Sequence, residues 1–141
     1  MTEVRNRPGV NSKILVVDDQ PGVRQLINEA LKSDGYLVHT AANGKQALRE
    51  IKENTPAVVL LDLKMPGMNG LELLQEIKKS GYQGAIITMT AYGELDLLTK
   101  AQKLGVDHHL TKPFDINDLR GLVRKVIEQY NYKKDNTVLR A

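Results

Sequence analysis

Three aspartates in this 141-residue sequence directly follow runs of aliphatic residues and could form one acidic site. Asp18 and Asp19 follow "ILVV", and Asp62 follows "VVLL". Clustered carboxylates repel one another and stay ionised together only when a counter-charge is near. A hard divalent cation supplies that charge, and Mg²⁺ binds to one or two carboxylates together with phosphate oxygens and water. The pattern therefore predicts a Mg²⁺ site, which Mn²⁺ could also occupy.

Two polar residues further along the chain, Thr90 and Lys112, extend this acidic cluster to a candidate phosphoryl site. Lys112 offers a positive charge and Thr90 a hydroxyl donor. A metal ion, a lysine and a hydroxyl donor are what the equatorial oxygens of a phosphoryl group need. One aspartate is then the natural nucleophile, forming an acyl phosphate. We expect it to be Asp62, because its strand should lie between the acidic pair and Thr90.

Five strand-like segments alternate with helical patterns and must position these residues. Their alternation predicts a parallel sheet with helices on both faces. The first, third and fourth segments are continuously apolar, as buried central strands are, whereas the second and fifth are interrupted as edge strands can be. We therefore predict a doubly wound, flavodoxin-like (βα)5 fold with strand order 2-1-3-4-5 and all five polar residues at one sheet edge. The segments are Ile14–Val17, Tyr36–Thr40, Ala57–Leu61, Ala85–Thr90 and Val106–Leu110.

Charge and composition predict one domain over residues 13–130, a flexible extension at residues 1–12 and a flexible basic tail at residues 131–141. The net charge of +3 lies on these two ends, so no basic face for nucleic acid is expected. The chain has no cysteine, no signal-peptide pattern and no apolar run near the ~18 residues of a membrane span. We therefore expect a cytoplasmic protein that does not bind membranes.

Four motifs, "ILVVDD", "VVLLDLKMPGMNG", "TAYG" and "TKPF", occur in an order and spacing that resemble the receiver domain of two-component response regulators. The resemblance covers residues 13–130. It implies that Asp62 is the phosphoacceptor and that Asp18 and Asp19 bind Mg²⁺ with the backbone carbonyl of Lys64. It also implies that Thr90 is a hydroxyl switch residue and that Lys112, with a cis bond to Pro113, contacts the phosphoryl group.

One position departs from the family pattern: the switch residue on the fifth strand, usually Tyr or Phe, is His109 here. The stretches "VDDQPGVRQLINE", "TAYGELD" and "KPFDI" more narrowly resemble single-domain regulators of the endospore phosphorelay. That resemblance implies phosphorylation by a sensor histidine kinase and transfer to a phosphotransferase histidine. An aspartyl-phosphate phosphatase is a further expected partner. The chain would then be a monomeric phosphoacceptor with slow autodephosphorylation, and not an enzyme.

A partner histidine must reach Asp62 in line, so its helices should rest on the rim of the pocket. We expect the contacts to come from the start of the first helix and from the loops after the third, fourth and fifth strands. Val23 and Tyr92 are the first choices because they lie nearest the strand ends, whereas Leu26 fits either contact or core packing. The predicted partner-binding residues are Gln20, Val23, Leu26, Tyr92, Pro113 and Phe114, beside Lys64 and Met65.

Four other functional classes share features with this sequence. Phosphatases of the haloacid dehalogenase type carry a D-x-D motif on the first strand. This chain instead reads Asp18-Asp19-Gln20, and its expected nucleophile is on the third strand. An interaction module that has lost phosphorylation conflicts with the presence of every acceptor residue. A transcription factor is excluded because no DNA-binding domain is expected after Tyr130. A chemotaxis regulator with a motor-binding output stays open, although His109 and "TAYGELD" favour the relay.

Overall fold

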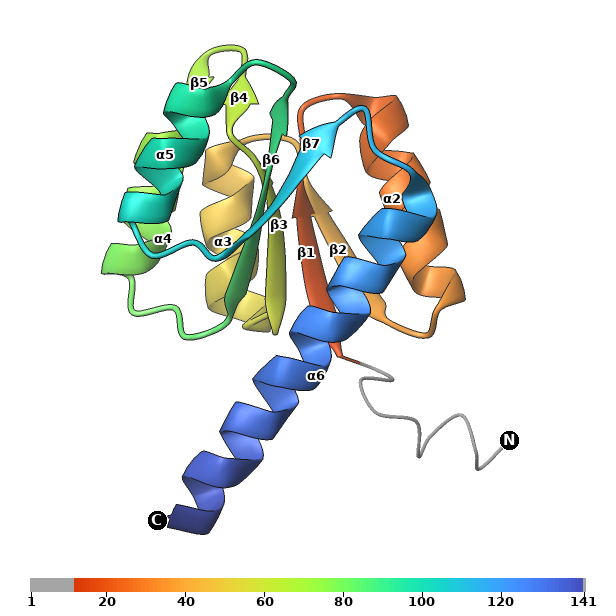
Figure 1. Ribbon diagram of the computed structural model, residues 1–141, viewed down its shortest axis with the longest axis vertical. Helices are drawn as coiled ribbons and strands as arrows, with labels where there is room; N and C mark the ends of the chain where they lie inside the picture. Colours follow the sequence, from red (N-terminus) through yellow and green to blue (C-terminus); the bar gives the residue numbers. More distant parts are fainter. Residues whose placement is uncertain (1–11, 141) are drawn as a thin grey trace.

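A five-stranded parallel sheet forms the centre of the computed structural model, which describes residues 12–140 (Figure 1). The strand order β2-β1-β3-β6-β7 confirms the predicted order 2-1-3-4-5 and places the continuously apolar strands in the middle. Each neighbouring pair runs parallel. The strands are β1 (Lys13–Val17), β2 (Leu37–Ala41), β3 (Val58–Asp62), β6 (Ala85–Ala91) and β7 (His108–Lys112).

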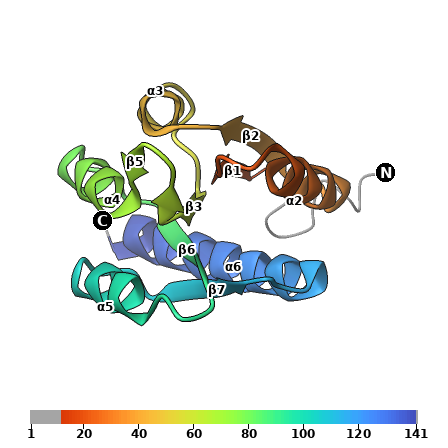
Figure 2. The same cartoon turned by 90° about the horizontal axis from the view of Figure 1, so that it is seen from above.

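Helices cover both faces of the sheet, as the alternation predicted (Figure 2). On one face lie α2 (Pro21–Ser33) and α6 (Ile116–Arg140). On the other lie α3 (Gly44–Asn54), α4 (Gly70–Lys79) and α5 (Leu95–Lys103). The strands feed two cores because successive side chains of a strand point to opposite faces. In β1, for example, Ile14 and Val16 pack toward α2 and α6, whereas Leu15 and Val17 pack toward the other three helices.

Local chemistry explains where several helices begin and end. The side chain of Asn43 accepts a hydrogen bond from the Gln46 N–H at the start of α3, as an N-cap asparagine does. Asp115 acts in the same way before α6, accepting from the Asn117 N–H at 2.7 Å. Gly35 follows the end of α2 with φ of 96°, a conformation that favours glycine.

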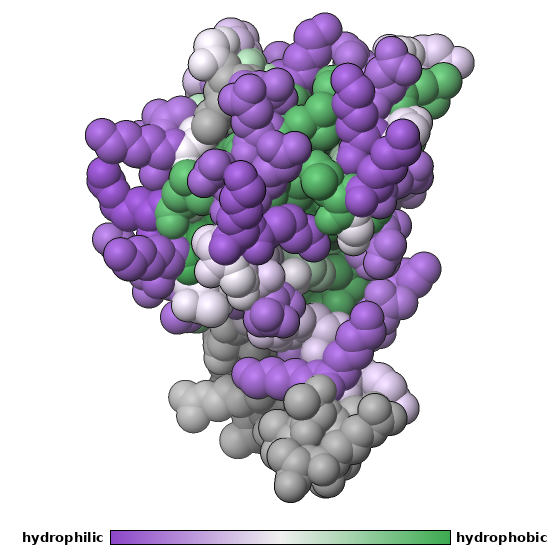
Figure 3. Space-filling view, turned by 90° about the vertical axis from the view of Figure 1, so that its left-hand side faces the viewer, coloured by the Kyte–Doolittle hydropathy of each residue, from purple (hydrophilic) through white to green (hydrophobic). Residues whose placement is uncertain are grey.

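The helices turn their apolar residues inward and leave a mainly polar exterior. Leu73, Leu74 and Ile77 of α4 and Ala101 of α5 are buried against the sheet. On the side of the molecule where α4 and α5 lie, hydrophilic side chains dominate and apolar atoms show only between them (Figure 3). Within residues 12–140, no helix has both the length and the apolar character that crossing a bilayer requires.

Two features differ from the sequence prediction. The last helix continues to Arg140, so residues 131–140, expected to be a flexible tail after Tyr130, are helical and project beyond the sheet (Figure 1). The loop after Asp62, predicted as a turn, contains a small antiparallel hairpin of β4 (Lys64–Met65) and β5 (Met68–Asn69). The predicted N-terminal extension lies outside the described residues except for Ser12, and so does Ala141.

Gly70 ties this hairpin loop to the end of β3. Its N–H donates to the Leu63 carbonyl at 3.2 Å, and a Cβ built on Gly70 would overlap the Leu63 backbone. Neighbouring backbone cannot give way as a flexible side chain can. Glycine is needed here because the start of α4 closely approaches the residue after Asp62.

We predict that Gly70→Ala lowers the free energy of unfolding by ~2 kcal/mol or more, because the added methyl group has no space. Gly121→Ala is the matched control: it lies within α6, nothing surrounds its Cβ position, and alanine should stabilise the helix by ~1 kcal/mol. Urea unfolding of both variants measures the difference. Equal stability of Gly70→Ala and wild type would contradict the packing argument.

Candidate functional site

An ion-paired lysine lies at the centre of the site, at the carboxyl ends of the strands. Lys112, at the end of β7, donates from Nζ to Asp18 Oδ2 at 2.7 Å and to Asp62 Oδ2 at 3.1 Å. The Asp18 side chain is fully buried, and Asp62 is only 4% exposed. The lysine therefore brings together groups from β7, β3 and the residue after β1. The predicted convergence of these residues at one sheet edge is confirmed.

The three aspartates form a compact oxygen cluster. Asp18, Asp19 and Asp62 each offer a carboxylate oxygen, and these oxygens lie within 4.8 Å of one another. Asp19 is half-buried and lines an open cleft together with Asp62, Lys64 and Lys112. Hard carboxylate oxygens at this spacing suit Mg²⁺, which keeps several waters and needs only one or two protein carboxylates. The cluster could therefore hold a metal ion.

Burial and hydrogen bonding act in opposite directions on Asp62. Burial raises the pKa of its carboxyl, and the Lys64 N–H, which donates to Asp62 Oδ1 at 3.1 Å, and the Lys112 ammonium partly offset this effect. Burial lowers the pKa of Lys112, but its bonds to Asp18 and Asp62 outweigh burial and raise it. The lysine therefore stays cationic at neutral pH and can neutralise part of the charge that a phosphoryl group brings.

Gln20 and Arg24, which follow β1 in the chain, hold Asp18 in place. The Gln20 N–H donates to Asp18 Oδ1 at 2.9 Å, and Arg24 Nη1 donates to the Asp18 carbonyl at 2.6 Å. The Gln20 side chain also accepts from Lys112 Nζ at 3.4 Å. Gln20 was predicted only as a partner contact, and Arg24 was not predicted at all. An arginine near the start of a helix gives no sequence signal that it will bond to the end of the preceding strand.

Thr90 and His109, the predicted switch residues, are in direct contact. Thr90 is 3% exposed, and its Oγ1 lies 2.9 Å from His109 Nε2. On the other side of the ring, Thr88 Oγ1 lies 2.8 Å from His109 Nδ1. Thr88 was not predicted, although a hydroxyl inside the otherwise apolar run "AIITM" was the signal that could have found it. The predicted cis Lys112–Pro113 bond is confirmed.

The predicted rim residues differ in exposure. Tyr92 is 90% exposed and Leu26 is 51% exposed, so both are open to a partner. Val23 and Phe114 instead pack against the core formed with α2 and α6. Gln20 and Pro113 are exposed. Leu26 is therefore more accessible to a partner than Val23, which was the first choice as a contact residue.

An exposed ion pair joins two loops beside the cleft. Lys64 Nζ donates to Glu94 Oε1 at 2.8 Å, linking the start of the hairpin after Asp62 to the residue that precedes α5. Exposed pairs of this kind contribute little to stability. Met65, which was expected at the rim, lines the cleft next to this pair together with Pro66.

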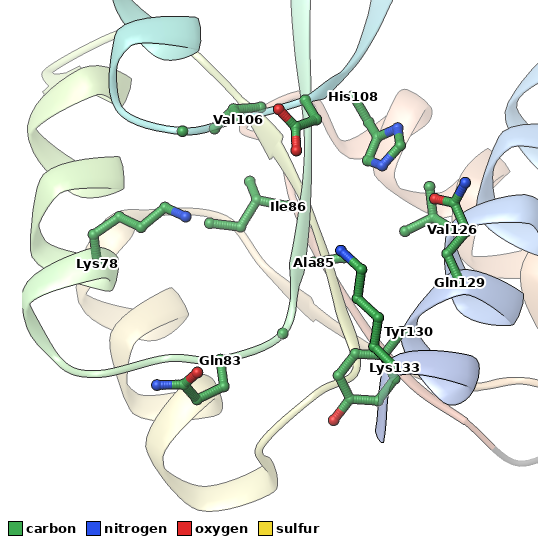
Figure 4. Close-up of a pocket in the computed structure, with 13 residues that line it drawn as sticks. Lys78, Gln83, Ala85, Ile86, Val106, His108, Val126, Gln129, Tyr130 and Lys133 are labelled. Atoms are coloured by element: carbon green, nitrogen blue, oxygen red, sulfur yellow. The ribbon is translucent and has the colours of Figure 1, made fainter. Parts of the chain in front are cut away.

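A separate hollow lies between β6, β7 and α6, and none of Asp18, Asp19 and Asp62 lines it (Figure 4). Lys78, Gln83 and Gln129 line it together with His108. His108 therefore lies at this hollow whereas His109 contacts Thr90, which agrees with the expectation that the adjacent histidines point to opposite faces of β7. Neither is part of the acidic cluster.

Comparison with known proteins decides the family. The model of the response regulator receiver domain matches residues 14–124. This chain belongs to the receiver domain family. It is 47% identical to "Sporulation initiation phosphotransferase F" of Bacillus subtilis (strain 168) over 118 residues, covering 84% of this chain and 95% of the relative.

Other relatives of this receiver domain are larger or of known structure. "Regulatory protein AtoC" of Escherichia coli (strain K12) is 34% identical over 88% of this chain, which spans only 27% of that protein. A crystal structure of a response regulator receiver domain protein from Clostridium thermocellum has a TM-score of 0.77 and 38% identity, covering 87% of this chain and 97% of that one. Family membership makes this chain a phosphoacceptor or relay protein and not an ordinary enzyme.

We predict that Asp62→Asn raises the free energy of unfolding in EDTA at pH 7. The folded state raises the pKa of Asp62, so it binds the carboxyl proton more tightly than the unfolded chain, and ionisation at neutral pH works against folding. A neutral amide of the same shape removes that cost. The gain should shrink as the pH falls through the pKa of Asp62 in the folded protein.

Asp34→Asn is the control for this measurement. Asp34 accepts two hydrogen bonds from Arg120, at 2.9 Å and 2.6 Å, so its loss should lower the free energy of unfolding by ~0.5–1 kcal/mol. Urea unfolding in EDTA compares both variants with wild type. Destabilisation by Asp62→Asn as large as that by Asp34→Asn would contradict the conclusion that the ionised, buried Asp62 carboxylate lowers the free energy of unfolding.

Proposed function

We propose that this receiver domain accepts a phosphoryl group from a histidine kinase on Asp62 and passes it to the histidine of a phosphotransferase. The observation that carries the proposal is the Asp62 carboxylate, buried yet lining the cleft, with Lys112 Nζ at 3.1 Å and the Lys64 N–H at 3.1 Å. A carboxylate with a fixed cation and a fixed backbone donor beside it suits attack on phosphorus.

The transfer needs no redox partner. A carboxylate oxygen of Asp62 forms the bond to phosphorus while the phosphorus–nitrogen bond of the donor phosphohistidine breaks, and the released imidazole takes up a proton. Lys112 neutralises part of the charge on the transferred group, and the Thr90 hydroxyl donates to one of its oxygens. Mg²⁺ held by Asp18, Asp19, Asp62 and the Lys64 carbonyl would supply further positive charge to the phosphoryl oxygens. The reverse steps deliver the group to the next histidine.

The relay role is favoured over a chemotaxis output by one comparison. The sporulation relative matches this chain at 47% identity over 95% of its own length. We therefore infer a sensor histidine kinase and a histidine phosphotransferase as partners, with a phosphatase of the aspartyl phosphate as a third. Slow autodephosphorylation fits the same role, because a relay intermediate must keep its acyl phosphate until the acceptor arrives.

Both partners must bring a histidine in line with Asp62 and so must cover the rim of the cleft. Leu26 of α2 and Tyr92 beyond β6 are two predicted rim residues with large exposed side chains. Aromatic and aliphatic anchors of this kind commonly carry a large share of the binding energy of an interface. We infer that these two residues contact the partners, whereas Val23 supports them from the core.

We predict that only Asp62 is labelled by radiolabelled acetyl phosphate. Wild type should take up label with Mg²⁺ and lose that uptake in EDTA, and Asp62→Asn should show only background because the amide is no nucleophile. Asp19→Ala should need far more Mg²⁺, since one anionic ligand is gone. Asp107→Asn, at an exposed carboxylate in the separate hollow, is the matched control and should label like wild type. Labelled Asp62→Asn, or full labelling in EDTA, would disprove the proposal.

We predict that Leu26→Ala and Tyr92→Ala slow transfer from a phosphohistidine protein by roughly ten- to a hundredfold, the cost of losing an interface anchor. Labelling by acetyl phosphate should stay unchanged, because that small donor needs no docking surface. Leu37→Ala on β2 and Tyr132→Ala on α6 remove exposed side chains of the same types elsewhere and should leave both reactions alone. Equal loss with both donors would show that the residues serve the pocket and not the partner.

A further inference from the structure

The imidazole of His109 is held between two buried threonines of the neighbouring strand. Thr88 Oγ1 lies 2.8 Å from Nδ1, and Thr90 Oγ1 lies 2.9 Å from Nε2. Thr88 is fully buried and Thr90 nearly so. The parallel pairing of β6 with β7 sets this geometry, because Thr88 is the register partner of His109. Both ring nitrogens therefore have a hydroxyl partner.

Counting protons selects one form of the ring. A third contact runs from Thr88 Oγ1 to the His108 carbonyl at 3.4 Å, and a carbonyl can only accept. Each hydroxyl has one proton, and a neutral imidazole has one N–H. All three contacts are satisfied when Thr88 donates to His108, Nδ1–H donates to Thr88, and Thr90 donates to Nε2. With the proton on Nε2 instead, Thr88 would need two protons. Burial lowers the pKa of His109, which keeps the ring neutral at pH 7.

The consequence concerns Thr90. Its single proton is committed to His109 Nε2 in this arrangement, so it is not available to an oxygen of a phosphoryl group on Asp62. Asp62 lies close by, since its register partner Met89 directly precedes Thr90. We propose that Thr88 is a positioning residue that keeps His109 in the Nδ1–H form, and that phosphorylation moves the ring to the Nε2–H form. This inference rests on the proposed function.

The exchange conserves protons. Nδ1 loses its proton to water while Nε2 gains one from water, and Thr88 turns its hydroxyl from the His108 carbonyl to Nδ1. Thr90 then accepts from Nε2–H, and its own proton is free to donate to a phosphoryl oxygen. Water can reach the ring, because His109 and Thr90 line a groove together with Tyr92 and Leu95 that opens to the surface. The Nδ1–H form is therefore the resting state of the switch.

The test is the ¹⁵N NMR spectrum of the histidine ring nitrogens, which distinguishes Nδ1–H from Nε2–H directly. Unphosphorylated wild type should show His109 as Nδ1–H, and protein kept phosphorylated by excess acetyl phosphate and Mg²⁺ should show Nε2–H. Thr88→Val keeps the shape but removes the acceptor of Nδ1–H. It should shift the tautomer ratio toward Nε2–H roughly fivefold without any phosphoryl donor, the factor expected for one ordinary hydrogen bond.

Two further variants make the result specific. Thr88→Ser keeps a hydroxyl and should restore the wild-type ratio. Thr111→Val makes the same change at a residue that lines the same groove from β7 and should leave the ratio unchanged. An Nε2–H ring in unphosphorylated wild type, an unchanged ratio in Thr88→Val, or an Nδ1–H ring in protein that carries label on Asp62 would each overturn the proposal. Failure of the proposed function looks different, because Asp62 would then take up no label while the resting ring stays Nδ1–H.

Discussion

The ammonium group of Lys112 lies between the buried carboxylates of Asp18 and Asp62, and the geometry of the site depends on this contact. Without it, two anions at neighbouring strand ends would repel each other in a poorly solvated place. Such buried ion pairs cost much desolvation and are weak sources of stability. Their presence here is better explained by chemistry: the lysine keeps Asp62 ionised and leaves a cation where phosphoryl oxygens would lie.

The parallel sheet makes this contact possible because it brings the carboxyl ends of β1, β3 and β7 to one edge. Both faces of the sheet are covered, so the central strands are anchored by two cores and their ends are fixed. Gly70 holds the loop after Asp62 against Leu63, and Arg24 donates a hydrogen bond to the carbonyl of Asp18. The rigid layers thus position the site, and its specific behaviour comes from the residues at the strand ends.

The sequence predicted the fold and the charged part of the site because both leave strong local patterns. Apolar runs that end in aspartate predicted the strand ends, and the motifs around Thr90 and Lys112 predicted the rest. Contacts between distant residues left weaker traces. Thr88 stood out only as a hydroxyl in an apolar run, and its contact with His109 depends on the register of β6 with β7. Leu26 belonged to the apolar stripe of α2 but lies at its edge and is half-exposed, which only packing decides.

The end of the last helix was missed for a different reason. The apolar stripe of α6 ends near Tyr130, so the sequence pattern showed no sign of helix in the tail beyond it. Polar residues continue a helix without leaving a stripe, and the backbone stays helical to Arg140. The apolar pattern therefore predicts which part of α6 packs on the sheet. The length of the helix depends on backbone hydrogen bonds, which that pattern does not reveal.

The central claim is that Asp62, and no other carboxylate of the cluster, carries the phosphoryl group. Borohydride reduction tests it directly, because it converts an aspartyl phosphate to homoserine, which mass spectrometry of the digested protein locates. After incubation with acetyl phosphate and Mg²⁺, we expect homoserine at residue 62 and unchanged aspartate at residues 18 and 19. Homoserine at either of those two positions, or no conversion at residue 62, would contradict the account.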